Sequence, residues 1–465
     1  MNVPPTSLDI APATPAPLPP TAGNGLISTL RFIRDTTSQF ESARRRLKTK
    51  VFRINGFLLR DVPTIIVSDA NEIRRIFEDS AEEFRTGFPP SVAEKFRQGI
   101  SAQHGAPHRR MRSIVRRPLA GGRAVASQQP MFLKLVEDSL ATCAAAKTPF
   151  IWRTYLRDLA FSFVARIALG AESEKDVRWL TERWDKVAPT VFFPSDFSQL
   201  PWWTAPVRWK LKSIYDEGAQ ALNEIRTYVE AAAVDRRQNP REDALTAMVR
   251  ETEEGQSMTM QQIVDTSLEF MFAGHETVKT AFASFLYFVH EHPSWKARLV
   301  EEQAALVAKG VPITVEGTRQ MPLLLLAIKE TLRWTPVTIL FRACDHDTTV
   351  GGYHVPAGWI IGLDIGGMHF DPDYWPEPHV WNPARFEGEN ERRDSAYFPF
   401  GRGRRSCIGE QPAMMELLTF GATVLRRMAK GLEYTVKPGS RDRWFHPGQH
   451  QHNPLIITRF TPGRE

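Results

Sequence analysis

A cysteine in the last part of the chain lies in a run of glycine and arginine residues. The run covers residues 398–409 and reads Phe-Pro-Phe-Gly-Arg-Gly-Arg-Arg-Ser-Cys-Ile-Gly, with Cys407 near its end. Gly401 and Gly403 allow a tight backbone turn that can approach a flat ligand closely. A helix is predicted from about residue 408, and its first N–H groups and dipole favour a thiolate at Cys407. The competing interpretation is a small buried hydrophobic cysteine.

A carboxyl and a hydroxyl stand next to each other in the middle of a long predicted helix. They belong to Glu276 and Thr277, and the helix is expected over about residues 260–290. Gly274 and Thr277 are about one turn apart, so we expect them to share a face. A glycine and a hydroxyl that competes for backbone hydrogen bonds suit a local opening of the helix. Taken alone, Glu276 reads equally well as a solvated helix residue and Thr277 as a core residue.

A second helix, expected over about residues 322–334, carries a spaced pair of opposite charges. Glu330 and Arg333 are three residues apart and can form an ion pair along this helix. If the pair is exposed, it contributes little to stability.

The loop around Cys407 resembles the haem-thiolate signature of the cytochrome P450 family, whose core is Phe-x-x-Gly-x-Arg-x-Cys-x-Gly. The matching residues are Phe400, Gly403, Arg405, Cys407 and Gly409, with Gly401 as a sixth. Four further segments are similar to motifs of this family and occur in the family's order: residues 105–112, 273–277, 330–333 and 382–386. The resemblance covers the chain from about residue 25 to its end.

The resemblance implies a role for each of these motifs. Cys407 would be the axial ligand of the iron of haem b, and a thiolate in that position favours O–O cleavage. The oxygen-activation motif would comprise Ala273, Gly274, Glu276 and Thr277, with the last two organising proton delivery. Glu330, Arg333 and Arg385 would form a buried network that fixes the cysteine loop. His275 receives no role, since it could simply pack or hydrogen-bond at the helix surface.

Haem also carries two propionates, which need cations or hydrogen-bond donors, and arginine pairs with carboxylates in a bidentate manner. The resemblance points first to Arg405 and then to Arg342. His108 and Arg112, about one turn apart on a predicted helix, complete the set, although His108 could equally cap or pack. Phe400, Gly401 and Gly409 are expected to contact the cofactor, and Gly409 would leave room for its ring.

Composition limits the classes of protein that the chain can belong to. It has 465 residues, of which 42% are hydrophobic and 24% charged, which excludes a disordered chain or a coiled coil. A net charge of +6 is too small to indicate a nucleic-acid partner. The three cysteines argue against a disulfide framework and for a reducing compartment. Neither a transmembrane anchor nor a signal peptide is recognisable, so a cytoplasmic protein is expected.

The elements that must position these residues are mostly helices. Residues 1–24 are expected to be a flexible, proline-rich lead, and residues 25–465 a single catalytic domain, since no linker or repeat interrupts them. Strands are predicted within residues 51–67, 348–363, 432–436 and 455–459, with helices over most of residues 71–335 and at 408–430. The predicted fold class is mainly α with a minor β part. The resemblance implies a P450 fold, with haem between the long central helix and the helix after the cysteine loop.

The resemblance also places an apolar and aromatic pocket around the substrate. The residues expected to line it are Phe88, Phe192, Phe193, Phe272, Val337, Ile339, Leu340 and His450. Such a lining suits a lipophilic small molecule, with a terpenoid, a steroid and a fatty acyl chain as the open choices. The aromatic residues between 192 and 203 could instead belong to the core or touch a membrane surface, and His450 could lie in a solvated turn.

A separate electron donor is expected, because 58 residues after Cys407 leave no room for a fused reductase (465 − 407 = 58). Residues 101–127 contain no acidic residue but five arginines of interest, at positions 109, 110, 112, 116 and 117. Together with Arg402 and Arg404 they are expected to dock an acidic donor of ferredoxin or flavodoxin type. The alternative is a solvated helix face.

The predicted function is therefore a haem-thiolate monooxygenase. It would insert one oxygen atom from O₂ into a lipophilic molecule by hydroxylation or epoxidation, as in secondary metabolism. A haem-thiolate peroxygenase or isomerase is one alternative, and a non-catalytic haem-binding protein is another. The adjacent Glu276 and Thr277 disfavour both alternatives, which do not need a proton-delivery pair.

Overall fold

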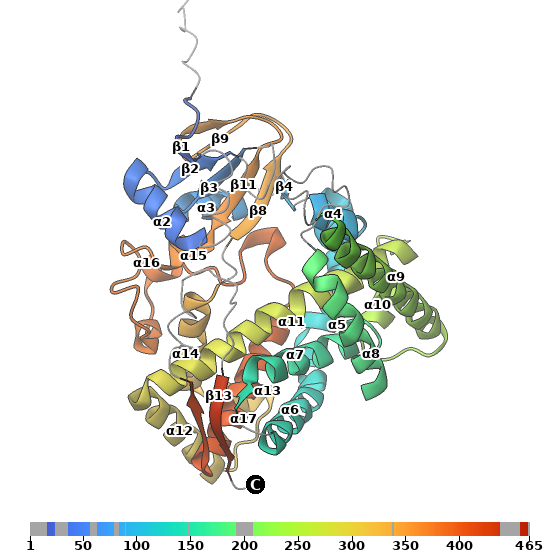
Figure 1. The fold of residues 1–465 in the computed structure, drawn as a ribbon, viewed down its shortest axis with the longest axis vertical. Coiled ribbons are helices and arrows are strands. Elements are labelled where there is room, and N and C mark those ends of the chain that lie inside the picture. Colours follow the sequence, from blue (N-terminus) through green and yellow to red (C-terminus); the bar gives the residue numbers. More distant parts are fainter. Residues whose placement is uncertain are drawn as a thin grey trace, which may run out of the picture.

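The structure is a computed structural model that describes residues 16–23, 36–55, 63–78, 83–88, 90–146, 149–191, 208–336, 339–437 and 456–463. A twisted sheet occupies one end of the molecule, and a larger helical part fills the rest (Figure 1). The prediction of a mainly α fold with a minor β part is confirmed. In the described part of the chain, no helix combines the length and the apolar character needed to span a membrane.

The helices of the described residues follow one another along most of the chain. In order they are α2 (Thr36–Leu47), α3 (Ala70–Glu78), α4 (Pro90–Lys95), α5 (Gly105–Ala120), α6 (Gly122–Ala145), α7 (Trp152–Ala168), α8 (Glu174–Val187), α9 (Arg208–Gln238), α10 (Ala244–Arg250), α11 (Met260–Glu291), α12 (Pro293–Ala308), α13 (Val315–Thr318), α14 (Pro322–Trp334), α15 (Ile365–His369), α16 (Glu391–Asp394) and α17 (Glu410–Ala429). Short 3₁₀ helices are η2 (Ile100–Ala102), η3 (Ala188–Thr190), η6 (Pro383–Phe386) and η7 (Gly403–Arg405).

The main sheet has the strand order β1-β2-β3-β11-β8-β4. These strands are β1 (Thr21–Gly23), β2 (Val51–Ile54), β3 (Thr64–Val67), β11 (Ile360–Asp364), β8 (Ile339–Cys344) and β4 (Phe84–Thr86). Smaller sheets pair β9 (Thr348–Val350) with β10 (Tyr353–Val355), β6 (Thr252–Glu253) with β7 (Gln256–Ser257), and β13 (Ile456–Pro462) with both β12 (Leu432–Val436) and β5 (Phe150–Ile151).

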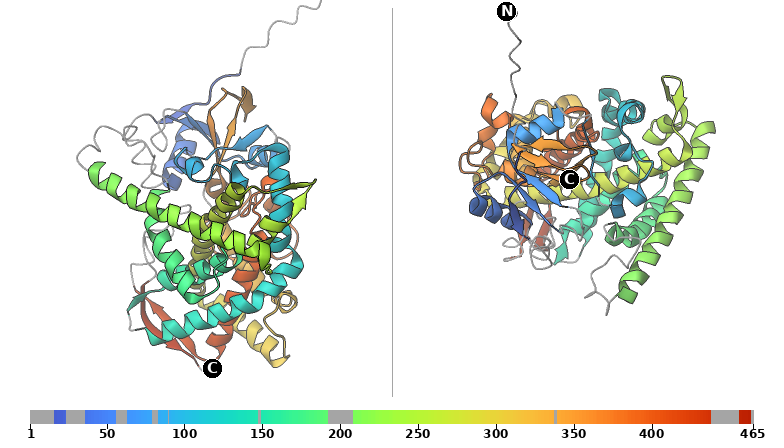
Figure 2. Two further views of the ribbon diagram at one scale, coloured as in Figure 1. Left: turned by 90° about the vertical axis from the view of Figure 1, so that its right-hand side faces the viewer. Right: turned by 90° about the horizontal axis from the view of Figure 1, so that it is seen from above.

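The long helix α11 crosses the helical part as its central element (Figure 1). Thr259 and Gln262 form a capping box that satisfies the first free N–H groups, and Pro293 stops the helix from continuing. Most of its side chains are buried. A helix buried on nearly all sides must be wrapped by others. Figure 2 shows α9, in green, crossing one face of this helical part.

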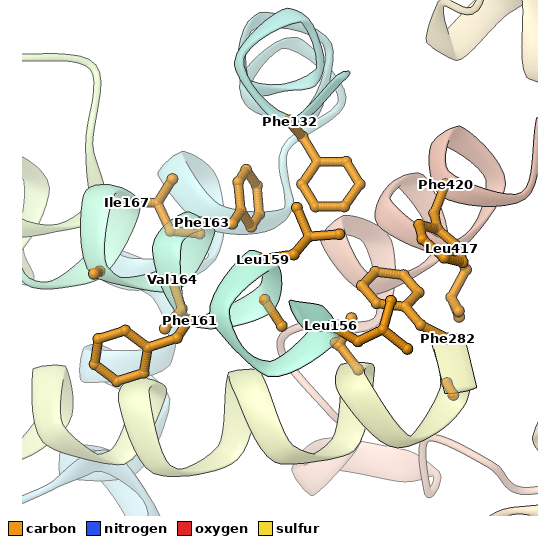
Figure 3. Close-up of a cluster of buried hydrophobic side chains, with 14 of the residues drawn as sticks. Phe132, Leu156, Leu159, Phe161, Phe163, Val164, Ile167, Phe282, Leu417 and Phe420 are labelled. Atoms are coloured by element: carbon orange, nitrogen blue, oxygen red, sulfur yellow. The ribbon is translucent and has the colours of Figure 1, made fainter. Parts of the chain in front are cut away.

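The core of the helical part is aromatic where α6, α7, α11 and α17 meet (Figure 3). Phe282 of α11 stacks on Phe420 of α17 with ring centroids 4.4 Å apart, and Phe132 of α6 meets Phe163 of α7 edge to face at 5.1 Å. Such pairs add about 0.5–1.5 kcal/mol each beyond the area that they bury. This packing fixes α11 relative to the helix that follows the cysteine loop.

Part of the proline-rich lead is ordered, which corrects the expectation for residues 16–23. Thr21–Gly23 form β1 beside β2, and the Pro20 carbonyl accepts a hydrogen bond from the Arg53 N–H at 2.9 Å. The Pro17 carbonyl accepts from the His354 N–H, also at 2.9 Å. Proline keeps its carbonyl and is tolerated at a sheet edge, so composition alone misjudged this segment. Residues 1–15 and 24 lie outside the described residues.

Candidate functional site

The loop before Cys407 is a tight turn whose glycines are required by their surroundings. Gly401 and Gly403 both have positive φ, of 66° and 69°. A Cβ added to Gly403 would lie 2.2 Å from the Phe77 carbonyl oxygen, so no side chain fits there. The Cys407 N–H donates to the Phe400 carbonyl at 2.8 Å and closes the turn. The predicted tight turn at Gly401 and Gly403 is confirmed.

The Cys407 side chain is exposed, although its thiol lies deep enough for burial to raise its pKa. The Glu410 carboxylate also raises this pKa, while the Gly409 N–H and the Arg112 charge lower it. The start of the helix and an arginine therefore favour the thiolate, as expected, but burial outweighs them and the net shift of the pKa is upward. The Glu410 carboxylate, the first residue of α17, adds to this rise. A coordinated metal ion would instead deprotonate the thiol directly.

The other two cysteines have quite different surroundings. Cys143 lies near the end of α6 and is buried in the core, and burial raises its pKa to about 12. Cys344 ends β8, is fully buried in the core of the sheet, and its pKa is likewise raised by burial. Of the three, only Cys407 is an exposed residue and lies in a loop.

One turn of α11 is exposed in the middle of an otherwise buried helix. The exposed residues are Ala273 and Thr277, and the Thr277 hydroxyl donates to the Ala273 carbonyl at 2.8 Å. Gly274, three residues before Thr277 on the continuous helix, is half-buried at the edge of this turn. A Cβ on Gly274 would lie 2.8 Å from a methyl group of Val164, so the glycine lets α7 approach. The helix is continuous here, without the expected opening.

Glu276 lies beside cations of α7 and α11. It is paired with Lys279 on its own helix, and Arg153 of α7 lies 3.9 Å away. Burial raises the pKa of Glu276, but its contacts with His275 and Lys279 lower it more and hold it below its usual range. The carboxyl is therefore charged at neutral pH. With 40% of its side chain exposed, it still reaches water.

His275 packs in the core between α11, α7 and α8. Its Nδ1 lies 2.7 Å from the Met271 carbonyl, and its Nε2 accepts from the Trp184 indole N–H at 3.2 Å. The Phe161 ring meets it edge to face at 5.5 Å. The same Nε2 lies 3.4 Å from Oε1 of Glu276. His275 is therefore a buried packing residue that also contacts the Glu276 carboxylate.

The predicted propionate ligands do converge near the cysteine loop. Arg112 of α5 donates to the Ser406 hydroxyl at 3.2 Å. Burial, and then the charges of Arg405 and Arg112, lower the pKa of His108 to about 4. Burial and the Arg405 charge lower the pKa of Arg342 to about 10. These shifts show that the four basic side chains share one positive region.

Arg405 is held by partners that the sequence did not reveal. Its guanidinium donates to the Thr86 hydroxyl at 3.1 Å and to the Gln103 carbonyl at 2.8 Å, and it lies 2.8 Å from Nδ1 of His104. Thr86 of β4 is opposite Arg342 in the β4–β8 ladder. The ladder therefore brings the two arginines from different parts of the chain to one place.

The positive region fits a dianionic cofactor. Within the described residues, no carboxylate pairs with Arg112 or Arg342, although Arg342 is only 7% exposed. A buried cation without a counter-ion is costly, so an anion is expected beside it. Two propionates supply such charge, and the exposed Cys407 lies on the same loop as Arg405. The residues present therefore fit haem.

The charged network that was expected to support the loop is present and buried. Arg333 makes two hydrogen bonds to the Glu330 carboxylate, at 2.8 and 2.9 Å, and Arg385 adds one at 3.0 Å. Glu330 and Arg333 are both fully buried. The expectation of a buried network, rather than an exposed pair of little value, is confirmed.

His369 links this network to the cysteine loop, and sequence reasoning missed it. Its Nε2 accepts from the Phe398 N–H at 3.1 Å, and its Nδ1 lies 3.2 Å from the Arg333 carbonyl. Arg333 donates back to the His369 carbonyl at 2.8 Å. Burial, with the Arg333 charge, lowers the pKa of His369 to about 3, which keeps the ring neutral. The isolated histidine gave no periodic or motif signal.

Two carboxyl groups nearer the start of α11 hold the segment that leads to α5, and they were also missed. Asp265 accepts from the Gln98 N–H at 2.8 Å, and Glu269 accepts from the Ser101 N–H at 3.1 Å. Burial, reinforced by the Asp265 charge, raises the pKa of Glu269 to about 8. Glu269 is one turn before Ala273, so it adjoins the exposed turn of α11.

The predicted substrate residues separate into three groups. Phe88, Phe272 and Leu340 are half-buried, and Leu340 lies close to Gly401 of the cysteine loop. The prediction that Ile339 lines the pocket is wrong. Its side chain packs against Gly362 and the cluster of Phe40 and Phe52, on the other face of the sheet. Neighbouring strand residues point to opposite faces. Phe192, Phe193, Val337 and His450 lie outside the described residues.

The strands β4 and β8 themselves were not predicted. β8 was treated only as a pocket segment, because its Arg342 interrupts the apolar pattern that marks a strand. β4 is only three residues long, too short for a periodic signal.

Comparison with known proteins agrees with this geometry. The family model for cytochrome P450 matches residues 17–445. The (1S)-1-hydroxy-luvungin A synthase CYP88A37 of Citrus sinensis is 28% identical over 366 residues, which cover 77% of this chain and 73% of that protein. The beta-amyrin 11-oxidase of Glycyrrhiza uralensis is 26% identical over 367 residues, with the same shares covered.

The fold is similar to that of a solved bacterial structure. Retinoic acid bound cyanobacterial CYP120A1 superposes with a TM-score of 0.81 at 25% identity, covering 96% of this chain and 100% of that one. The family match spans both the cysteine loop and α11, and the structural match spans the whole fold. The chain therefore belongs to the cytochrome P450 family and is a haem b monooxygenase.

Proposed function

We propose that this protein oxidises an isoprenoid-like lipophilic molecule, with Cys407 as the axial ligand of its haem and electrons from a separate acidic protein. The observation that carries the assignment of Cys407 is its environment. It is the one exposed residue among the three cysteines, on a loop whose Arg405 belongs to a positive region with buried Arg342. Neither Cys143 nor Cys344 combines these features.

Haem b, when bound, supplies the activation of O₂, and its thiolate ligand favours O–O cleavage. The chain's own part is to hold the thiol and the propionates. The Gly401–Gly403 turn presents Cys407, and the Gly409 N–H donates to its sulfur. The guanidinium groups of Arg342 and Arg405 would each bind a propionate through two charged hydrogen bonds. His108, whose low pKa keeps its ring neutral, would donate one N–H.

Proton supply would fall to the exposed turn of α11. The charged Glu276 carboxylate, 40% exposed, can hold water beside the turn by accepting its hydrogen bonds, while Lys279 and Arg153 keep the carboxylate in place. The Thr277 hydroxyl, which rests on the Ala273 carbonyl, can rotate and pass a proton toward the site. Gly274 contributes by letting α7, and thus Arg153, approach the helix.

The choice of substrate class rests on the relatives and on the apolar side chains near the site. Beta-amyrin and retinoic acid, the molecules in two of the relatives' names, are both isoprenoid skeletons. Phe88, Phe272 and Leu340 are half-buried apolar side chains, which suit such a skeleton. We expect hydroxylation or epoxidation of an isoprenoid ring or chain.

A spectroscopic comparison of cysteine variants tests the ligand. In the reduced, carbon monoxide-bound protein, Cys407→Ser should lose the Soret position of a thiolate haem. Cys344→Ser and Cys143→Ser should keep it, and they serve as matched controls. The assignment fails if Cys407→Ser keeps the thiolate spectrum, or if Cys344→Ser is the variant that loses it.

A ligand titration tests the substrate class. A panel of triterpenes, diterpene acids, retinoids, steroids and fatty acids is added to the ferric protein while the Soret band is followed. A saturable shift to high spin with the isoprenoids, and not with the fatty acids, supports the proposal. A shift with the fatty acids alone contradicts it.

The electron donor would dock on the arginines of α5 beside the cysteine loop. Arg109 and Arg116 are exposed there. Of the other arginines in the expected patch, Arg402 pairs with Glu78 at 3.2 Å, and Arg117 lies 3.7 Å from Glu251. The proposed docking surface centres on the exposed side chains of Arg109, Arg116 and Arg404.

A further inference from the structure

A cluster of three side chains at the edge of the main sheet has no part in the haem site. It consists of Glu83, Cys344 and His346, which each offer one ligand atom, and these atoms all lie within 4.8 Å of one another. The β4–β8 ladder creates the cluster, because Phe84 is paired with Cys344. Glu83 comes just before β4, and His346 comes two residues after the end of β8.

The groups around the cluster orient its ligand atoms. The Thr348 hydroxyl donates to Oε1 of Glu83, and Nε2 of His346 lies 3.7 Å from the same oxygen. Backbone N–H groups of Asp345 and His346 hydrogen-bond the Cys344 thiol. Metal ligands are typically fixed by such outer hydrogen bonds, which hold the donor atoms in place.

We propose that Glu83, Cys344 and His346 form a zinc site. One sulfur, one nitrogen and one oxygen donor match zinc, and they do not match calcium or magnesium, which prefer oxygen ligands. In a tetrahedral zinc site, neighbouring ligand atoms lie about 3.3–3.6 Å apart. The cluster must therefore contract by about an ångström. The His346 side chain, 61% exposed, has the freedom to do so. Water would occupy the fourth position.

Zinc here would cross-link two strands that reach the haem site. β4 is the edge strand and has β8 as its ladder partner. At the other end of the same ladder, Thr86 accepts from Arg405 and lies opposite Arg342. The zinc ion would therefore fix the position of β4, whose Thr86 accepts a hydrogen bond from Arg405, one of the proposed propionate ligands. The proposal requires that Cys344 is not the ligand of haem iron, which the cysteine variants described above test separately from zinc binding.

Equilibrium dialysis of the haem-loaded protein tests the site. The protein is stripped with a chelator and dialysed against buffered Zn²⁺, and the bound zinc is then measured by atomic emission. We expect one zinc per chain in the wild type. Because losing an outer partner already costs about 10- to 100-fold in affinity, Cys344→Ala and His346→Ala should each weaken binding by at least tenfold. Cys143→Ala, a matched buried cysteine, should bind like the wild type.

His346→Ala keeps the test decisive if Cys344→Ala fails to fold, since the His346 side chain is exposed. Unchanged binding by His346→Ala overturns the proposal. X-ray absorption at the zinc edge of the wild type gives a second readout. One sulfur at about 2.3 Å with nitrogen or oxygen at about 2.0–2.2 Å supports the site. A zinc shell without sulfur overturns it.

Discussion

Thr277 is the residue at which the proton proposal can be tested most directly. Replacing it by alanine removes the hydroxyl that rests on the Ala273 carbonyl and leaves the helix bond pattern intact. We expect the ratio of product to NAD(P)H consumed to fall several-fold, with hydrogen peroxide released instead. Thr280→Ala is the control, because its hydroxyl bonds the Glu276 carbonyl in the same way. Equal coupling in both variants would exclude Thr277 from proton delivery.

Glu330 offers a stability test at the same scale. Glu330→Ala leaves the fully buried Arg333 without its carboxylate. Removing one partner of a buried ion pair costs about 3–5 kcal/mol. The loss should appear in chemical unfolding and as lower haem content, because His369 connects Arg333 to the cysteine loop.

Asp138→Ala removes one partner of an exposed pair with Lys134 and should cost less than about 1 kcal/mol. If Glu330→Ala and Asp138→Ala lower the free energy of unfolding equally, the buried network contributes no more to stability than an exposed ion pair.

Local geometry was predictable from the sequence where a motif fixes both type and spacing. Glu330, Arg333 and Arg385 form the buried network that the motifs implied. His369 and Glu269 were missed because their roles depend on contacts between distant segments, to Phe398 and Ser101. The close approach of Val164 to Gly274 was missed because helical spacing alone does not say which neighbouring helix a glycine meets.

At the scale of elements, Glu269 makes the link between α11 and η2 sensitive to pH. Its pKa in the folded protein is about 8, against an ordinary value of 4.5. Below about pH 4.5 the carboxyl is protonated whether the chain is folded or not. Between pH 4.5 and 8 only the unfolded chain ionises, so stability falls as the pH rises and then levels off.

Melting temperatures from pH 5 to 8 measure this slope. Glu269→Gln should flatten it, because the amide does not ionise, whereas Glu254→Gln in an exposed turn should leave it unchanged. An identical slope in the wild type and Glu269→Gln would show that Glu269 does not titrate in this range.

Elements were predictable in proportion to their length. The helix expected over residues 322–334 has those bounds in the structure, and α11 differs from its predicted range by one residue. β4 and β1 have three residues each, and their hydrogen-bond partners are remote in sequence. No local pattern can reveal strands whose existence is decided by the ladder they join.

At the scale of the whole molecule, the docking proposal predicts a salt-dependent rate. Arg109→Glu combined with Arg116→Glu should slow reduction by an acidic ferredoxin by at least about tenfold at low ionic strength, with the gap closing as salt screens the charges. Arg178→Glu on α8, also exposed, is the matched control and should leave the rate unchanged. A slowing that is the same at low and high salt would contradict electrostatic docking.

The six-stranded sheet has a further consequence for how copies of this chain meet. Within the described part of the chain, both of its edges are three-residue strands, β1 and β4, and β1 follows directly on Pro19 and Pro20. Long, flat edges invite strands of other molecules, whereas short edges and prolines discourage them. We therefore expect the proline-rich segment to disfavour edge-to-edge association of two sheets, an effect that is separate from anything at the haem.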